Sequence, residues 1–154
     1  GNYILCWDNA RFINHSANSN CITTAYEFEI AIRDIQPGEE LTDDYGYLNL
    51  NEPFEVVPEP GTDRNVIYPD DLLRYYPEWD EKLLQSFPQA MQVDQPLFNL
   101  LDRTLQAKVK DIVSGNRKMD SILNCYYRAG QVRSLNGYAQ KNIDLRSSRI
   151  SYPY

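Results

Sequence analysis

The feature that most constrains the fold of this chain is a nine-residue stretch, 25–33, in which side chains alternate between two faces. One face carries only large apolar residues: Tyr26, Phe28, Ile30 and Ile32. The other face carries the charged ones: Glu27, Glu29 and Arg33. This period of two predicts a half-buried β-strand with one face against a core. Pro37 and Gly38 then predict a type II turn, followed by a second short strand near residues 40–42.

The pattern becomes helical after a stretch rich in Pro, Glu and Asn, 49–69, which we expect to be a long surface loop. Asp70 and Asp71 are suited to a helix N-terminus, because acidic side chains favour the first turn of a helix. Pro77 is expected to stop that helix. A second short helix is predicted over residues 78–87.

The apolar spacing further along predicts the longest helix, over residues 96–114, with Gly115 as its C-terminal cap. Its apolar positions are Leu97, Leu100, Leu101, Leu105, Val109, Ile112 and Val113. Another helix is predicted to end at Gly130 and to carry these residues on one face: Met119, Ile122, Leu123 and Tyr126. The remaining residues are polar and weakly patterned, so an irregular tail is expected.

The composition is that of a globular domain, with 154 residues of which 42% are hydrophobic and 24% charged. No run of about 18 apolar residues and no basic-then-apolar start is present, so we expect a soluble intracellular protein without a membrane span. Three cysteines, Cys6, Cys21 and Cys125, are spaced too widely for a zinc cluster, and His15 is the single histidine. Reduced thiols and no metal site are therefore expected.

Charge is distributed unevenly along the chain. Residues 1–94 hold 18 acidic side chains against 5 Lys and Arg, whereas residues 95–154 hold 4 against 10. An acidic surface on the first part would attract Lys-rich or Arg-rich peptides and repel phosphate backbones. A basic protein or peptide is thus the expected partner, and nucleic acid is not. The same charges could also simply keep the surface hydrated.

Two segments, 11–16 and 38–47, carry the residue types that suggest chemistry. Taken alone, His15 could be an ordinary hydrogen-bonding residue, and Tyr45 and Tyr47 could simply pack around a turn at Gly46. No GxSxG motif supports Ser16 as a hydrolase nucleophile. The two segments occur together with the alternating strand between them, which chance explains less easily.

Together these segments resemble the SET-domain family of protein lysine methyltransferases. Arg11-Phe12-Ile13-Asn14-His15-Ser16 is similar to the family motif RFxNHS. Asn20-Cys21 is similar to the Asn-Cys pair downstream of it, and residues 40–46 are similar to the motif ELxxDYG. The resemblance spans residues 7–47. It implies an α+β fold of small β-sheets in which the two segments cross in a knot-like arrangement of the β-clip type, followed here by a helical C-terminal extension.

The resemblance also implies a role for particular side chains. Four would line the pocket of the cofactor S-adenosylmethionine: Arg11, Phe12, Asn14 and His15. Asn14 and His15 would act partly through main-chain groups at the adenine end. Tyr45 would be the catalytic tyrosine. Tyr47 and Asp43 are the candidates for the substrate-lysine channel, with Asp43 standing where many members have an aromatic residue.

The family's Gly-x-Gly cofactor motif is absent, because no two of the seven glycines are two residues apart. We therefore expect residues 1–50 to be the C-terminal part of a SET domain whose N-terminal half is missing. The surface loop 51–69, a helical extension without a zinc cluster, 70–130, and an irregular tail, 131–154, would follow.

Three hypotheses about function remain open at this point. The first is S-adenosylmethionine-dependent methyl transfer to a protein lysine, by a domain that is truncated here and whose activity alone is in question. The second is a non-catalytic SET-like module that binds basic peptides through an acidic groove. The third is a homodimer or strand exchange that covers the missing half.

Overall fold

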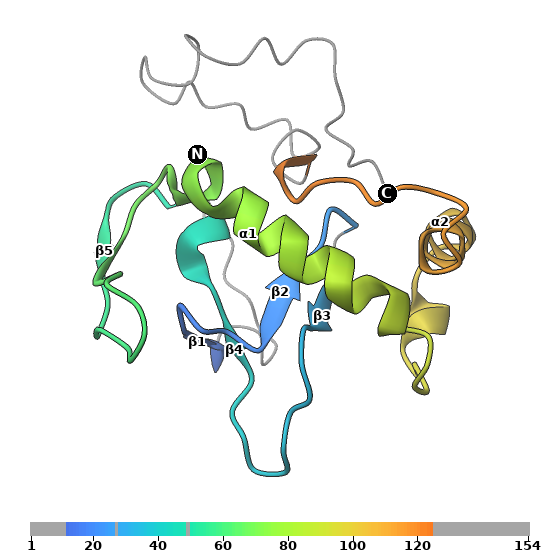
Figure 1. Ribbon diagram of the computed structural model, residues 1–154, viewed down its shortest axis with the longest axis horizontal. Helices are drawn as coiled ribbons and strands as arrows, with labels where there is room; N and C mark the ends of the chain where they lie inside the picture. The colour runs from blue at the N-terminus through green and yellow to red at the C-terminus, as the bar shows by residue number, and fades with distance from the viewer. Residues whose placement is uncertain (1–11, 27, 49, 125–154) are drawn as a thin grey trace, which may run out of the picture.

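Short strands followed by two helices give the α+β arrangement that the sequence predicts. The computed structural model describes residues 12–26, 28–48 and 50–124 (Figure 1). Within these ranges three two-stranded sheets form: β1 (Asn14–His15) with β4 (Thr42–Asp43), β2 (Cys21–Thr23) with β3 (Glu29–Ala31), and β5 (Phe54–Glu55) with β6 (Val66–Ile67). The helices are α1 (Asp71–Ser86) and α2 (Arg103–Val113). Short 3-10 turns are η2 (Tyr45–Tyr47), η3 (Phe87–Gln89) and η4 (Phe98–Leu100).

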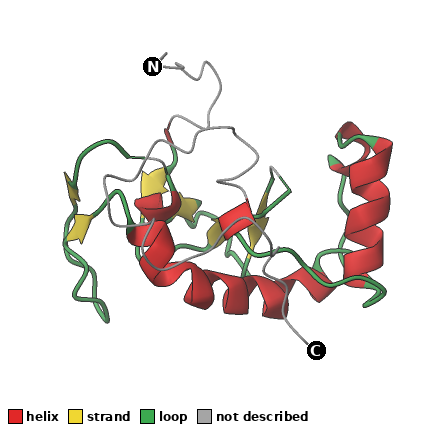
Figure 2. Ribbon diagram, turned by 90° about the horizontal axis from the view of Figure 1, so that it is seen from above, coloured by secondary structure: helices red, strands yellow, loops and turns green. Residues whose placement is uncertain are grey.

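Helix α1 is the element around which the others are arranged. It crosses in front of the small sheets, with the β5–β6 hairpin beside its N-terminal end (Figure 1). Helix α2 lies near the C-terminal end of α1 and runs at a steep angle to it, so the two helices form a corner (Figure 2). None of the helices among the described residues is both long enough and apolar enough to cross a membrane.

The strand predicted over residues 25–33 is confirmed only in part: β3 covers residues 29–31, whereas Ala25 and Tyr26 lie in the turn before it and are both buried. β3 pairs antiparallel with β2, so that Ile22 stands opposite Ile30 at the centre of the pair. Exposure then alternates along β3, with Ile30 shielded between Glu29 and Ala31, which face solvent. The period-two prediction is therefore correct for the less exposed side of β3 but too long at its start.

The predicted turn after this strand is also confirmed. Gly38 has a φ of +86°, and the N–H of Glu39 donates to the carbonyl of Gln36 at 2.9 Å, as a type II turn requires. The strand after it, β4, forms at residues 42–43 rather than 40–42. The reason is that the amide of Asn20 donates to the carbonyl of Glu40 at 2.7 Å, which leaves that carbonyl outside any ladder.

The prediction that Pro77 stops a helix is wrong, because α1 continues through it to Ser86. Proline removes one main-chain hydrogen bond and crowds the preceding turn. Here its ring lies on the exposed face, while Leu72, Trp79 and Leu83 on the opposite face are each at most 3% exposed. Burial of those side chains on both sides of Pro77 outweighs the lost bond.

The long helix predicted over residues 96–114 is only partly correct. α2 begins at Arg103, because the side chain of Asp102 accepts the N–H groups of Thr104 and Leu105 and so caps the helix there. Leu97 and Leu100, assigned to the buried stripe, are instead 71% and 79% exposed. The C-terminal end is as predicted, with Gly115 just beyond α2 at a φ of +76°.

A single hydrophobic core joins the strands to both helices and to the residues after α2. Its members include Ile22, Tyr26, Trp79, Leu83, Phe87, Val109, Ile112, Met119, Ile122 and Leu123. Polar contacts fix the last part of it: the N–H of Asp120 donates to the Tyr26 hydroxyl at 2.6 Å. The carboxylate of Asp80 accepts the hydroxyl of Ser121 and the N–H of Ile122 at 2.6 and 2.8 Å. The predicted burial of Met119, Ile122 and Leu123 is confirmed, whereas Tyr126, Gly130 and the tail lie outside the described residues.

Candidate functional site

The two segments that resemble the SET motifs lie side by side. β1 and β4 run parallel, with Asn14 opposite Thr42 and His15 opposite Asp43. The N–H of Ser16 extends the pair by donating to the carbonyl of Asp43 at 2.9 Å. Parallel pairing of strands from distant parts of a chain needs a crossover, which the β2–β3 hairpin and its following turn provide.

His15 and Tyr45 are in direct contact at the end of this pair. The main-chain N–H of Tyr45 donates to Nδ1 of His15 at 3.1 Å, and the two ring centroids are 5.3 Å apart. The Tyr45 hydroxyl donates to the carbonyl of Ile13 at 2.6 Å. Residues 13–15 of the first motif segment therefore hold Tyr45 of the second at both its main chain and its hydroxyl group.

These contacts fix the tautomer of the neutral His15 imidazole. Because Nδ1 accepts the N–H of Tyr45, the neutral ring carries its proton on Nε2. That Nε2 atom is buried and has no hydrogen-bond partner among the described residues. Burial lowers the pKa of His15, and the carboxylate of Asp44 opposes this shift while the Arg64 guanidinium adds to it.

Asp44 is the charged centre behind the tyrosine. Its side chain is 2% exposed and receives two hydrogen bonds from Arg64, at 2.6 and 3.0 Å. The same carboxylate accepts the N–H of Gly46 at 2.9 Å and so caps the η2 turn. Arg64 reaches on to Asp71 of α1 at 3.2 Å and lies over the ring of Tyr75. A buried ion cluster therefore links the turn of the tyrosine to α1.

Gly46 is required by space rather than by backbone conformation. A Cβ placed on Gly46 would stand 2.7 Å from a guanidinium nitrogen of Arg64, 3.0 Å from the ring of Trp79 and 3.1 Å from Asp44. Its φ is not among the positive values. The Tyr-Gly-Tyr order of this turn thus follows from the tight approach of Arg64 and Trp79.

Asn20 joins the segments at a second point. Its side-chain oxygen accepts the N–H of Thr42 at 2.9 Å, while its amide donates to Glu40 and Glu39. The residue is 1% exposed, so these bonds are made away from water. The Asn14 side chain, by contrast, is exposed and donates to the Glu40 carboxylate at 2.6 Å.

Asp43 is buried in a way that the sequence does not indicate. Its side chain lies toward the β2–β3 pair and shares a hydrogen bond with the carboxyl of Glu29. Desolvation, followed by the charge of Glu29, raises the pKa of Asp43 to about 8. The same surroundings raise the pKa of Cys21 to about 11. At neutral pH both groups are therefore mainly in their neutral form in the folded protein.

The raised pKa of Asp43 predicts a specific dependence of stability on pH. Between about pH 4 and 8 only the unfolded chain ionises at this position, so the free energy of unfolding falls as pH rises. Asp43→Asn keeps a neutral donor to Glu29 and cannot ionise. We expect the free energy of unfolding of Asp43→Asn, relative to that of the wild type, to increase by up to about 1.4 kcal/mol per pH unit as pH rises through this range. Urea denaturation of both proteins at several pH values measures this, and a difference in stability that does not change with pH would contradict it.

The other candidate residues occupy different surroundings. Tyr47 is 9% exposed and packs edge-on against Trp79, with ring centroids 5.5 Å apart. Its hydroxyl is buried and has no partner in the described part of the chain. Phe12 is 64% exposed. Arg11 lies outside the described residues, so its predicted contact with a cofactor stays a prediction.

Three contributors to the site were missed by sequence reasoning, and all lie in or beside the predicted surface loop. The ring of Phe54 is 6.0 Å from that of Tyr45, and Glu59 accepts the hydroxyl of Ser16 at 2.9 Å. Arg64 is the third. A signal for Arg64 was present, because it is the only Lys or Arg between residues 34 and 73, among eleven acidic residues. Phe54 and Glu59 have no comparable signal.

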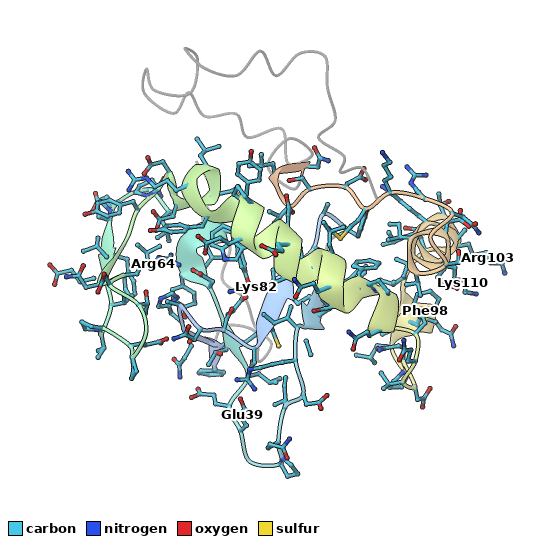
Figure 3. All side chains as sticks on the ribbon, viewed as in Figure 1. Glu39, Arg64, Lys82, Phe98, Arg103 and Lys110 are labelled. Atoms are coloured by element: carbon cyan, nitrogen blue, oxygen red, sulfur yellow. The ribbon has the colours of Figure 1, made fainter. Side chains whose placement is uncertain are left out.

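A polar cleft of about 440 Å³ adjoins the ion cluster. Its lining includes Asp44, Arg64, Trp79 and Lys82, but neither His15 nor Tyr45. Figure 3 shows Arg64 beside the η2 turn and Lys82 below α1. Within the residues that the structure describes, no group of three or more His, Cys, Asp or Glu side chains is placed to hold a metal ion.

Comparison with known proteins agrees with this arrangement. The family model of the SET domain matches residues 2–46, which include both segments that meet at His15 and Tyr45. No curated protein and no solved structure matches the chain. Residues 2–46 of this chain are therefore identified as similar to the SET domain.

Proposed function

We propose that this protein transfers a methyl group from S-adenosylmethionine to the side-chain amine of a lysine in a basic protein or peptide. The observation that carries the proposal is the contact between His15 and Tyr45, made by an N–H to Nδ1 bond of 3.1 Å across two paired motif segments. Since residues 2–46 are similar to the SET domain, a family whose members are generally protein lysine methyltransferases, this contact supports a shared pocket for donor and acceptor. The knot-like crossing of the two segments is part of the proposal.

The residues around His15 fit a cofactor with an adenine ring. Neighbouring residues in a strand direct their main-chain groups to opposite sides. Because the N–H of Ser16 faces β4, the N–H and carbonyl of His15 face the other edge of β1, where no described strand pairs with them. A donor and an acceptor on one residue suit the edge of a purine. The buried Nε2 of His15 is a further donor at this position.

In the proposed reaction the cofactor supplies an electrophilic methyl group on a sulfonium, and the protein positions a neutral amine in line with it. The Tyr45 hydroxyl donates its hydrogen bond to the Ile13 carbonyl, so the lone pairs of its oxygen are left to accept an N–H of the amine. An apolar surrounding favours the neutral amine over the ammonium ion. Phe54, with its ring 6.0 Å from that of Tyr45, contributes to such a wall. The earlier channel candidates lie elsewhere, with Asp43 beside Glu29 and Tyr47 packed against Trp79.

The charge around the site supports a basic substrate. Residues 34–63 contain nine acidic side chains and no Lys or Arg. Several of these acids are exposed on the elements next to Tyr45, including Glu40, Glu52 and Glu55. Clustered negative charge of this kind raises the association rate of a cationic peptide and makes it dependent on ionic strength.

The test is equilibrium binding of S-adenosylmethionine by calorimetry, followed by mass spectrometry of a Lys-rich peptide incubated with protein and cofactor. We expect saturable cofactor binding and a mass increase of one or more methyl groups on lysine. Absence of binding at millimolar cofactor would contradict the proposal for this chain.

A second function is favoured by the same acidic stretch. If the chain binds a Lys-rich peptide in a salt-dependent manner but does not bind S-adenosylmethionine, it is a non-catalytic module that recognises basic segments. Peptide binding measured without cofactor, in 50 and 300 mM salt, separates this outcome from the enzymatic one, because only the enzyme needs both ligands.

A further inference from the structure

We propose that Arg64 is a positioning residue for Tyr45: by pairing with Asp44, it allows Nδ1 of His15 to keep accepting the main-chain N–H of Tyr45. The catalytic meaning of this role rests on the proposed methyl transfer. The state of His15 itself can be measured in the absence of any activity, so the two proposals can fail separately.

The geometry around His15 disfavours protonation of Nδ1, which would make the imidazole positively charged. Nδ1 is 3.1 Å from the nitrogen of Tyr45 and 3.9 Å from Oδ1 of Asp44. A proton on Nδ1 would point at another N–H and would remove the acceptor that fixes the tyrosine backbone. An unpaired Asp44 carboxylate at this distance would favour that proton, because an opposite charge stabilises the imidazolium ion.

Arg64 is the group that neutralises the negative charge of the Asp44 carboxylate. It gives Asp44 two hydrogen bonds, and its side chain is only 12% exposed, so the pair interacts with little screening by water. The bond to Asp71 and the contact with the Tyr75 ring, 4.4 Å from the guanidinium carbon, hold Arg64 in place from α1. A series of contacts thus runs from α1 through Arg64 and Asp44 to the imidazole of His15.

The groups facing His15 from each packed element are few. Asp44 and the Asp43 carbonyl act from β4 and the turn after it, Glu59 from the β5–β6 hairpin, and Arg64 from the segment before β6. Burial lowers the pKa of His15, the two carboxylates and the Asp43 carbonyl raise it, and Arg64 lowers it. Removal of Arg64 or of Asp44 is therefore expected to act on the imidazole with opposite signs.

His15 is the only histidine of the chain, so its titration can be followed by NMR after labelling with ¹³C,¹⁵N-histidine. In the wild type we expect the proton on Nε2 and none on Nδ1 at neutral pH. Arg64→Met is expected to raise the pKa of His15 above its wild-type value, and Asp44→Asn to lower it. Arg64→Lys keeps one charge without the two-bond geometry and should give an intermediate pKa. Arg103→Met, at the opposite end of the molecule on α2, is the matched control and should leave it unchanged (Figure 3).

The opposite signs distinguish this role from a purely structural one. If Arg64 and Asp44 only held the fold together, loss of either would loosen the site and move the pKa of His15 in the same direction, toward its ordinary value. That result, or a wild-type proton on Nδ1, overturns the proposal. Should Arg64→Met fail to fold, Arg64→Lys and Asp44→Asn still give the two signs. Where methyl transfer is measurable, Arg64→Lys is expected to lose activity at acidic pH before the wild type does.

Discussion

Tyr45→Phe is expected to reduce methyl transfer by about 100-fold or more while changing the affinity for S-adenosylmethionine little. The change removes only the hydroxyl, which is anchored to the carbonyl of Ile13 at 2.6 Å and is the group proposed to receive the substrate amine. The ring contact with His15 and the main-chain bond to Nδ1 are made by atoms that phenylalanine retains. Initial rates with a Lys-rich peptide and calorimetry with the cofactor give the two quantities.

A matched control is Tyr68→Phe, because Tyr68 is 40% exposed and lies outside the paired segments. It should leave both the rate and the affinity near the wild-type values. Tyr45→Phe should also lower the free energy of unfolding by about 1 kcal/mol through the lost bond to Ile13. A Tyr45→Phe protein with the wild-type rate would remove Tyr45 from its proposed role, and a large loss of cofactor affinity would assign it to the cofactor pocket instead.

Gly46→Ala is expected to destabilise the fold by about 3 kcal/mol, the largest effect on stability among the glycine changes considered. The added methyl group cannot be accommodated by rotation of a free side chain, because Arg64 is fixed by Asp44 and Asp71. Movement of Arg64 would leave the buried Asp44 carboxylate without its partner. Denaturation by urea, monitored by tryptophan fluorescence, measures the loss, since Trp79 is itself 3.0 Å from the added atom.

Gly61→Ala is the control for the general cost of replacing glycine. Gly61 has a φ of +84° and open space around its Cβ position, so alanine there should cost about 1 kcal/mol through backbone strain alone. Equal losses at the two positions would show that the crowding at Gly46 relaxes without penalty. They would also weaken the case that Arg64 is held in one place.

The parts of this structure that the sequence predicts are those determined by local pattern. The alternation is matched along β3, residues 29–31, because Ile30 is less exposed than its two neighbours. Pro37 and Gly38 predict their turn because each has a restricted or unusual backbone preference. The contact of His15 with Tyr45 follows from the resemblance to a family, not from any pattern in the residues themselves.

The parts that the sequence does not predict depend on tertiary packing. Continuation of α1 through Pro77 depends on the burial of Trp79 and Leu83 against strands that precede it by some fifty residues. The raised pKa of Asp43 depends first on its burial and then on the approach of Glu29 from another strand. A two-residue strand is too short to show which face is inward. Arg64 lies in a stretch with little periodicity, so its two carboxylate partners could not be inferred from spacing.

The bond from the N–H of Asp120 to the Tyr26 hydroxyl joins residues 94 positions apart. Contacts of such high sequence separation form late, because the intervening chain must first be ordered at an entropic cost. During synthesis on the ribosome, the segment bearing His15 and Tyr45 therefore emerges well before the residues that complete its core, Met119 to Leu123. Newly made chains should remain sensitive to proteases and dependent on chaperones until translation has passed this point.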